Sequence, residues 1–304
     1  MCIRDRKSIT SILQTKEFDI VQLETLYMTP YIPVIREYTN ARIALRSHNV
    51  ESQIWQNLAI QTSGPKRWYI QHCSSMLQKY ELDIRGSYDM LIPITELDAK
   101  YFRDRGESAK MRVVSVGLDM ENYSVVQTLQ KTYRLGFIGS LDWQPNLEGI
   151  EWFLNKVWPN IKSVNQDIEF HIAGRNMPNY VKELKLKDVT IYGKVDSAID
   201  FMNSMDLIVV PLFSGSGIRV KILEAMALGK IVLSTSKGYE GIGVTDKFNA
   251  LIFNSASELI EKLEMISSMD VENMGMNARA HIEKHFSNSA LSKNLMDFYA
   301  KAIE

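Results

Sequence analysis

The sequence is short of the residues on which whole classes of protein depend. It has two cysteines in 304 residues, too few for a disulfide framework or a thiolate metal cluster and suited to a reducing, cytoplasmic compartment. Its 35 basic and 36 acidic residues give a net charge of −1, which argues against a nucleic-acid partner. Apolar runs such as 207–213 are far too short to cross a bilayer, whereas a peripheral contact with a membrane stays open.

Several ligand-binding patterns are also missing. Gly215 and Gly217 would need a glycine at position 220 to form a dinucleotide fingerprint, and Val220 stands there. Gly229-Lys230 is followed by isoleucine rather than serine or threonine, so a phosphate-binding loop of the NTPase type is excluded. The sequence has no Asp-x-Asp pair for a metal-bound diphosphate and no zinc-ligand spacing. We therefore predict neither a metal nor a cofactor.

What the sequence does have is a regular alternation of strand-like and helix-like segments. Short apolar, β-branched runs predict strands at 18–24, 42–47, 89–95, 111–116, 133–139, 168–174, 189–193, 206–213, 230–234 and 250–253. Helical periodicity predicts helices at 7–15, 51–85, 96–104, 145–162, 179–185, 218–228, 256–265, 271–285 and 289–302. The near-continuous apolar strands predict an α/β fold with parallel, doubly wound sheets covered on both faces.

A polar segment at 118–131 breaks this alternation. We interpret it as a linker between an N-terminal domain (1–117) and a C-terminal domain (132–304), whose last helix is expected to pack back on the first domain. The first domain opens on a helix, and residues 1–6 (MCIRDR) look like translated sequencing-adaptor sequence. We therefore expect upstream strands to be missing; the alternative is a naturally short first domain.

The segment with the clearest chemical pattern is 209–229. A buried strand leads into Ser214-Gly-Ser-Gly217 and then into an Ala/Leu-rich helix. Glycines allow close approach of a ligand, and the first turn of a helix favours an anion. Lys221 and Glu224 share a helix face, which suits a diphosphate and a ribose; the alternative is an ordinary helix start with a surface ion pair. The core-facing stripe is predicted at Val220, Leu223 and Ala227.

Two other segments end strands. In 135–146 (LGFIGSLDWQPN) a strand ends in Gly139-Ser140, and Pro145 suits the first turn of the next helix. Such loops lie at the carboxyl edge of a parallel sheet, where ligands bind, although the segment can also be a plain tight turn. In 46–51 (RSHNVE) a strand runs into a polar turn that contains His48, and the alternative is a structural histidine. Trp152 and Trp158 are predicted to be core residues.

With these segments in place, the sequence resembles the family 4 retaining glycosyltransferases of the GT-B fold. The resemblance runs from about residue 18 to the C-terminus and is strongest in 135–243. It is carried by 46–51 (RSHNVE), 94–98 (ITELD), 137–146 (FIGSLDWQPN), 172–175 (IAGR), 193–196 (GKVD), 215–227 and 234–243 (STSKGYEGIG). It implies two Rossmann-like domains that face a cleft, with the acceptor in the first and a nucleotide-sugar donor in the second.

The resemblance also implies a role for individual residues in the second domain. Gly139 and Ser140 would lie beside the donor phosphates, and Gly217 and Ile218 would offer backbone N–H groups. Val195 would lie by the nucleobase.

The charged positions follow from the same resemblance. Arg219 and Lys221 would supply cations, and Glu224 matches the second glutamate of the family's Glu-x7-Glu motif and would hold the ribose. The first glutamate of that motif is replaced by Ser216, and the Arg and Lys that many members place after the Gly139 loop are absent. His48 would contact the donor sugar. The residues expected to carry catalysis are therefore His48, Lys221 and Glu224.

The function implied is sugar transfer from a nucleotide-diphosphate sugar to an acceptor hydroxyl, with retention of configuration and without a metal. The acceptor would be a saccharide or a lipid-linked molecule in cell-surface polysaccharide or glycolipid synthesis, in the cytoplasm or at the inner face of the membrane. The alternatives are a non-catalytic nucleotide-sugar-binding fragment and a GT-B-fold nucleotide-sugar epimerase. A dehydrogenase is disfavoured, because neither half has an intact dinucleotide fingerprint.

Overall fold

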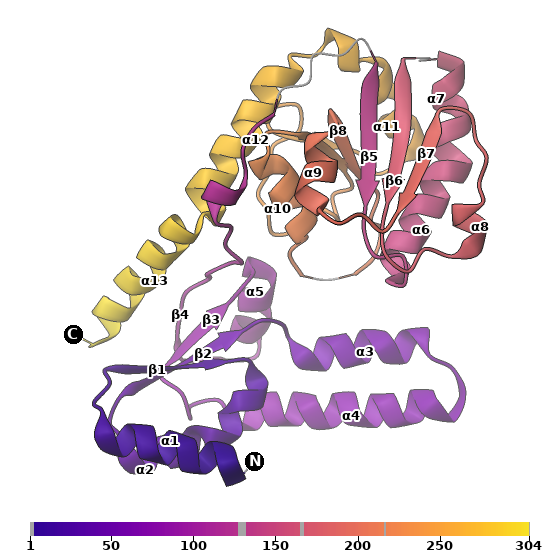
Figure 1. Ribbon diagram of the computed structural model, residues 1–304. Coiled ribbons are helices and arrows are strands. Elements are labelled where there is room, and N and C mark those ends of the chain that lie inside the picture. The colour runs from indigo at the N-terminus through magenta and orange to yellow at the C-terminus, as the bar shows by residue number, and fades with distance from the viewer. Residues whose placement is uncertain (1–2, 127–131, 165–166, 216, 304) are drawn as a thin grey trace. The chain divides into compact units, whose positions relative to one another are not determined.

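The computed structural model describes residues 3–126, 132–164, 167–215 and 217–303 (Figure 1). The chain divides into two compact units, one formed by Met1–Ser115 with Leu291–Glu304 and the other by Val116–Ala290. Residues 118–126 of the predicted linker lie in the second unit, and residues 127–131 lie outside the described residues.

The first unit contains a four-stranded parallel sheet in the order β1-β2-β3-β4. Its strands are β1 (Ile20–Glu24), β2 (Arg42–Ser47), β3 (Met90–Pro93) and β4 (Lys110–Met111). Side chains alternate between the two faces of a strand. In β2, Ile43 and Leu45 therefore join one apolar cluster and Ala44 joins the other.

Helices cover both faces of this sheet. Clusters of buried apolar residues lie against α1 (Ile3–Thr15), α2 (Ile32–Tyr38) and α5 (Glu96–Asp104) on one face. On the other face, Phe298, Tyr299 and Ala302 of α13 (Asn288–Ile303) pack on Ala44 and Ile92. The short helix α2 and the 3-10 turn before it (Leu26–Tyr31) have no counterpart in the sequence prediction.

The predicted helix at 51–85 is wrong in one respect, because the chain forms two helices there, α3 (Glu51–Gln61) and α4 (Gly64–Asp83). A residue before proline is disfavoured in the helical region, and Gly64, which precedes Pro65, has a φ of 67°. The helix therefore cannot continue through 62–64, and the chain reverses into a hairpin (Figure 1).

The second unit contains a six-stranded parallel sheet in the order β10-β9-β8-β5-β6-β7. Its strands are β5 (Tyr133–Ile138), β6 (Ile168–Ala173), β7 (Val189–Gly193), β8 (Leu207–Val210), β9 (Ile231–Ser234) and β10 (Leu251–Ile252). The reversal of strand order beside β5 is the topological switch point, where open α/β sheets bind ligands.

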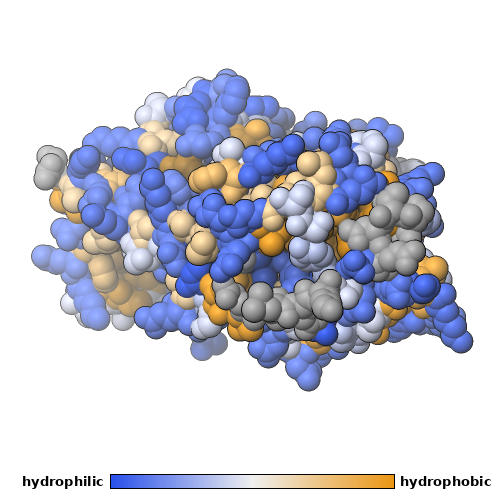
Figure 2. All heavy atoms as spheres, turned by 90° about the horizontal axis from the view of Figure 1, so that it is seen from above, coloured by the Kyte–Doolittle hydropathy of each residue, from blue (hydrophilic) through white to orange (hydrophobic). Residues whose placement is uncertain are grey.

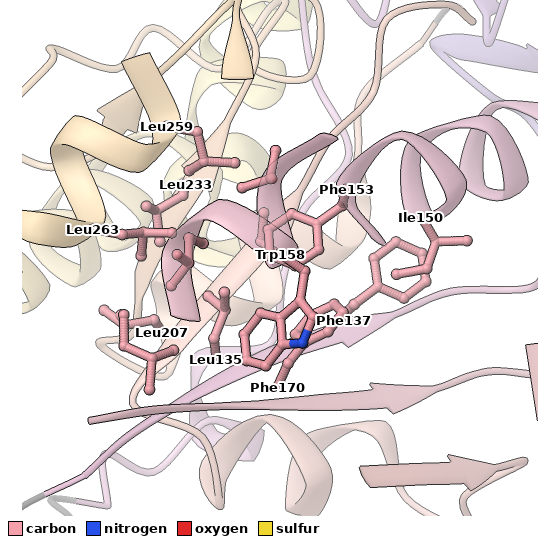
Figure 3. Close-up of a cluster of buried hydrophobic side chains, with 14 of the residues drawn as sticks. Leu135, Phe137, Ile150, Phe153, Trp158, Phe170, Leu207, Leu233, Leu259 and Leu263 are labelled. Carbon is pink, nitrogen blue, oxygen red and sulfur yellow. The ribbon is translucent and has the colours of Figure 1, made fainter. Parts of the chain in front are cut away.

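Two apolar clusters fill the space between this sheet and its helices. In β8, Leu207 and Val209 face one cluster, and Ile208 and Val210 face the other. Figure 3 shows the first cluster, in which Phe137, Phe153, Trp158 and Phe170 pack beside a row of leucines. The helices are α6 (Gln144–Trp152), α7 (Trp158–Val164), α8 (Asn179–Lys182), α9 (Ala198–Asn203), α10 (Val220–Ala227), α11 (Ala256–Glu264) and α12 (Val271–Phe286).

The predicted α/β class with parallel sheets covered on both faces is confirmed. A π-helical turn at Phe153–Val157 interrupts the helix predicted at 145–162, and α9 is an element that the sequence prediction missed. Hydrophilic residues cover most of the face seen in Figure 2, with apolar residues scattered among them. Among the described residues, the search for helices of bilayer-spanning length and apolarity finds none.

Candidate functional site

Three strands of the second unit end together at one edge of the sheet. Ile138 pairs with Ala173, and Ala173 pairs with Gly193. A Cβ atom at Gly174 would lie 2.0 Å from the carbonyl oxygen of Gly139. Only glycine therefore permits this close approach of the two chain segments, and it fixes the position of Gly139, which lines the pocket described next.

A pocket of about 350 Å³ opens at this edge. Its lining combines the end of β5 and the start of α6 with the start of α10 and one face of α9: Ile138, Gly139, Trp143, Asn146, Ala198, Met202, Ile218, Arg219, Val220, Lys221 and Glu224. Five of the predicted site residues are in this set.

Val220, which was predicted to face the core, is 39% exposed. That prediction is wrong because α10 begins at Val220, so its side chain lies on the first turn beside the pocket rather than over the sheet.

Lys221 is held by neutral oxygen atoms. Its Nζ donates to the carbonyl oxygen of Ile138 at 3.1 Å and to Oδ1 of Asn146 at 2.7 Å. It also lies 5.1 Å from the ring centroid of Phe137. Burial, with the charge of Arg219 as the second cause, lowers the pKa of Lys221 to about 7. In the part of the chain that the structure describes, no carboxylate forms an ion pair with this ammonium group, so the site favours a bound anion.

Asn146 fixes the β5–α6 loop to α10. Its Nδ2 donates to the carbonyl oxygen of Ser140 at 2.8 Å while its Oδ1 accepts from Lys221. A Cβ atom at Gly139 would lie 2.7 Å from Nδ2 of Asn146 and 3.0 Å from Nζ of Lys221. The loop thus sets the position of the cation. Asn146 belongs to the 137–146 motif, but no pattern in the sequence distinguishes it from its neighbours there.

The glycine-rich loop before α10 has the conformation that its composition predicts. Gly215 and Gly217 have φ angles of 94° and 84°, a region in which other residues are strained. Arg219 is buried, donates to the carbonyl oxygen of Gly217 and lies 5.7 Å from the ring of Trp143. Ile218 lines the pocket. Ser216 lies outside the described residues.

Glu224 lines the pocket one turn beyond Lys221 and accepts a hydrogen bond from the Tyr123 hydroxyl at 3.1 Å. Burial raises the pKa of Glu224, and the hydrogen bond from Tyr123 opposes this effect. Burial and the neighbouring carboxylate raise the pKa of Tyr123 to about 12. Sequence analysis missed Tyr123, because it stands 101 positions before Glu224 in a segment interpreted as a linker.

The wall of the pocket beside these charged groups is apolar. Ala198 and Met202 of α9 line it. Val195 is partly buried and packs against the cluster that contains Met202 and Phe201. Ser140 does not line the pocket; its hydroxyl donates to Asp142 at 2.5 Å.

His48 belongs to the first unit. Its Nε2 lies 2.7 Å from Oε2 of Glu24, and Arg46 lies 3.9 Å from the same carboxylate. Partial burial raises the pKa of Glu24, but the hydrogen bonds from His48 and Gln22 and the charge of Arg46 outweigh it, so the pKa lies below its ordinary value. The structure therefore gives His48 a carboxylate partner at the end of β2, a contact that was not predicted.

The search for three or more His, Cys, Asp or Glu side chains placed to hold a metal ion finds no such group among the described residues.

The chain is similar to known proteins in sequence and in fold. Residues 132–268 match the family described as "Glycosyl transferases group 1". An uncharacterized 44.6 kDa protein in the cps region of Klebsiella pneumoniae is 26% identical over 311 residues, which cover 96% of this chain and 77% of that relative.

The model also superposes on solved structures. Sucrose-phosphate synthase from Thermosynechococcus elongatus matches with a TM-score of 0.71 and 15% identity over 98% of this chain and 77% of that one. HepE from Anabaena in complex with UDP matches with a TM-score of 0.71 and 14% identity over 98% of this chain and 81% of that one. The same protein in complex with UDP-glucose matches with a TM-score of 0.64 and 14% identity over 96% and 82%. The chain therefore has the GT-B fold, and residues 132–268, within its second unit, match the family described as Glycosyl transferases group 1.

Proposed function

We propose that this protein is a glycosyltransferase that moves a sugar from a nucleotide-diphosphate sugar to an acceptor hydroxyl. The observation that carries the proposal is Lys221, a buried ammonium group held by neutral oxygens at the switch point of a parallel sheet. A diphosphate supplies the negative charge that this arrangement lacks. The group 1 domain and the UDP and UDP-glucose complexes of HepE support the same assignment.

Each group of residues in and beside the pocket is proposed to bind one part of the donor. Lys221 and Arg219 neutralise the diphosphate together with the backbone N–H groups of Gly217 and Ile218, and Gly139 and Ser140 flank it. Glu224, oriented by Tyr123, accepts from the ribose hydroxyls. The nucleobase lies against the apolar wall near Val195.

The remaining roles complete the proposal. His48 contacts the donor sugar, and Ser216 is kept among the donor-binding residues. In the transition state, negative charge grows on the departing diphosphate, and fixed cations stabilise it without a metal. Attack by the acceptor hydroxyl from the face that the diphosphate leaves retains configuration.

We further propose that the acceptor is a saccharide or a lipid-linked molecule of cell-surface polysaccharide or glycolipid synthesis. The relative from a cps region supports a polysaccharide. Lipid-linked acceptors lie at a membrane, so we place the reaction in the cytoplasm at the inner face of the membrane.

The direct test is calorimetry of nucleoside diphosphates and nucleotide-sugars with the whole chain and with Glu224→Ala. We expect one base to be preferred and Glu224→Ala to weaken that binding about tenfold to hundredfold, the usual loss for a hydrogen bond to a charged group. Glu264→Ala, an exposed carboxylate at the end of α11, is the matched control and should bind like the parent.

Product analysis then identifies the reaction. A retaining glycosyltransferase yields nucleoside diphosphate and a glycosylated acceptor in which the anomeric configuration is unchanged, whereas an epimerase converts the sugar of the donor without any acceptor. Diphosphate affinity that is equal in the parent and Glu224→Ala would contradict the proposed site, and binding without turnover across an acceptor panel would favour a non-catalytic binder.

A further inference from the structure

The hairpin formed by α3 and α4 is a surface that donor chemistry does not use. The two helices run side by side beyond the edge of the first unit's sheet (Figure 1). Buried Glu81 holds their base together, since it accepts hydrogen bonds from the backbone N–H of Ser52 at 3.2 Å and from its hydroxyl at 2.5 Å. The hydroxyl of Ser74 donates to the carbonyl oxygen of Ser52 at 2.9 Å. The hairpin is therefore fixed at its base, and its far end is the turn near residue 63.

Between the acidic residues at its base, the hairpin carries charge of one sign. Between Glu51 and Glu81 the sequence contains no aspartate or glutamate, but it contains Lys66, Arg67 and Lys79. Because acidic residues are absent from it, this stretch has a net charge of +3, whereas the whole chain has a net charge of −1. Lys66 and Arg67 follow the turn directly and are exposed.

The same end of the hairpin exposes large apolar side chains. Trp68 is 72% exposed, Ile60 is 68% exposed and Tyr69 is 61% exposed. Trp68 stacks on His72, with ring centroids 6.0 Å apart and an interplanar angle of 12°. Met76, two turns along α4 from Tyr69, is also exposed. Aromatic and aliphatic side chains beside cations are the composition of surfaces that enter the headgroup region of a bilayer.

We infer that the α3–α4 hairpin docks on an anionic lipid surface, with Ile60, Trp68 and Tyr69 in the headgroup boundary and Lys66 and Arg67 against lipid phosphates. An acidic polymer would satisfy the cations but would leave Ile60 and Met76 in water. A bilayer satisfies both, because it offers negative charge above an apolar phase. The inference extends the membrane contact proposed above and requires no sugar transfer.

The test is flotation of the whole chain with vesicles of phosphatidylglycerol mixed with phosphatidylcholine, compared with phosphatidylcholine alone. We expect binding to the anionic vesicles only, reduced by salt. Lys66→Gln combined with Arg67→Gln should weaken partitioning roughly 25-fold, or about fivefold per cation. Trp68→Ser combined with Tyr69→Ser should weaken it by about tenfold or more at unchanged charge. Brominated lipid should quench tryptophan emission of the parent more than that of Trp68→Phe.

Matched controls lie in the second unit. Lys185→Gln with Lys187→Gln removes two exposed lysines, and Phe248→Ser removes an aromatic side chain that is 55% exposed; both should partition like the parent. Each hairpin variant should keep its circular dichroism spectrum and its nucleotide affinity measured without vesicles. The inference would be overturned if the chain did not bind vesicles, if the control variants lost as much binding, or if the chain bound an acidic polysaccharide but not vesicles. None of these outcomes would bear on the proposed nucleotide site, which the calorimetry tests.

Discussion

The carboxyl ends of the two parallel sheets hold their cations in different ways. In the first unit, Arg46 near the end of β2 and His48 just after it lie beside the carboxylate of Glu24. In the second unit, Lys221 lies at the end of β5 and contacts neutral oxygens of Ile138 and Asn146. At the first edge, the carboxylate of Glu24 lies beside Arg46 and His48. At the second edge, the ammonium group of Lys221 contacts neutral oxygen atoms rather than a carboxylate.

The pKa values express the same difference. A nearby opposite charge favours the charged form of a group, and burial without one disfavours it. The pKa of Glu24 is lowered by its partners and that of Lys221 is lowered to about 7 by burial. A structural ion pair therefore stabilises the first edge, while the second edge is arranged for an anion that arrives from solution.

The largest effect is expected for Lys221→Met. Loss of the ammonium group should weaken nucleoside-diphosphate binding about 100-fold, or about 2.7 kcal/mol, within the range for a charge-assisted contact. The thermal midpoint should stay within about 4 °C of the parent, since a buried charge is replaced by an apolar side chain of similar length. Calorimetry and thermal unfolding measure the two effects. A large loss of stability with unchanged affinity for the diphosphate would show that Lys221 has a structural role, as the ion pairs of Glu24 do in the first unit.

Gly139→Ala should have the next largest effect. The new Cβ atom would lie 2.7 Å from Asn146 and 3.0 Å from Nζ of Lys221, so both side chains must move, and we expect diphosphate affinity to fall about tenfold. Gly136→Ala in β5, the strand that precedes this loop, is the control, because its Cβ atom would crowd the side chains of Met205 and Ile208 instead of Asn146 and Lys221. Equal diphosphate affinity in the two variants would show that the loop at Gly139 does not take part in binding the anion.

A smaller effect is expected from pH. A bound anion raises the pKa of Lys221 from its value of about 7, so above pH 7 binding must take up a proton. We expect nucleotide-sugar affinity to fall about fivefold between pH 7 and pH 8. Calorimetry in buffers of different ionisation enthalpy should detect that proton. Lys221→Met should abolish both the uptake and this part of the pH dependence; uptake that persists in the variant would assign it to another group.

The smallest effect is expected for Glu24→Gln. The lowered pKa of Glu24 means that its charge stabilises the fold above the unfolded pKa and that this contribution is lost as pH falls through the folded value. The carboxylate is half exposed, so we expect a loss of less than about 1 kcal/mol at pH 7 that disappears as the pH falls below the ordinary pKa of a glutamate. Diphosphate affinity should not change. Denaturant unfolding at several pH values measures the loss of stability. A loss of nucleotide affinity in Glu24→Gln would contradict the view that Glu24 has only a structural role.

Sequence patterns predicted the strands well because buried parallel strands are continuous apolar runs. Arg42–Ser47 and Val189–Gly193 were predicted with their observed bounds. The short helices α2 and α9 were missed, since seven and six residues are too few to show a helical period. Val220 was assigned to the core because periodicity gives the faces of a helix but not the residue at which the helix begins.

The sequence by itself determined the α/β class, the glycine-rich loop before α10 and the shared face of Lys221 and Glu224, because these depend on residues close together in the chain. Only the tertiary structure decided what those groups meet. Tyr123 reaches Glu224 and Asn146 reaches Lys221 across 101 and 75 positions. Such contacts, and the burial that lowers the pKa of Lys221, arise when distant segments pack together, and no local pattern encodes them.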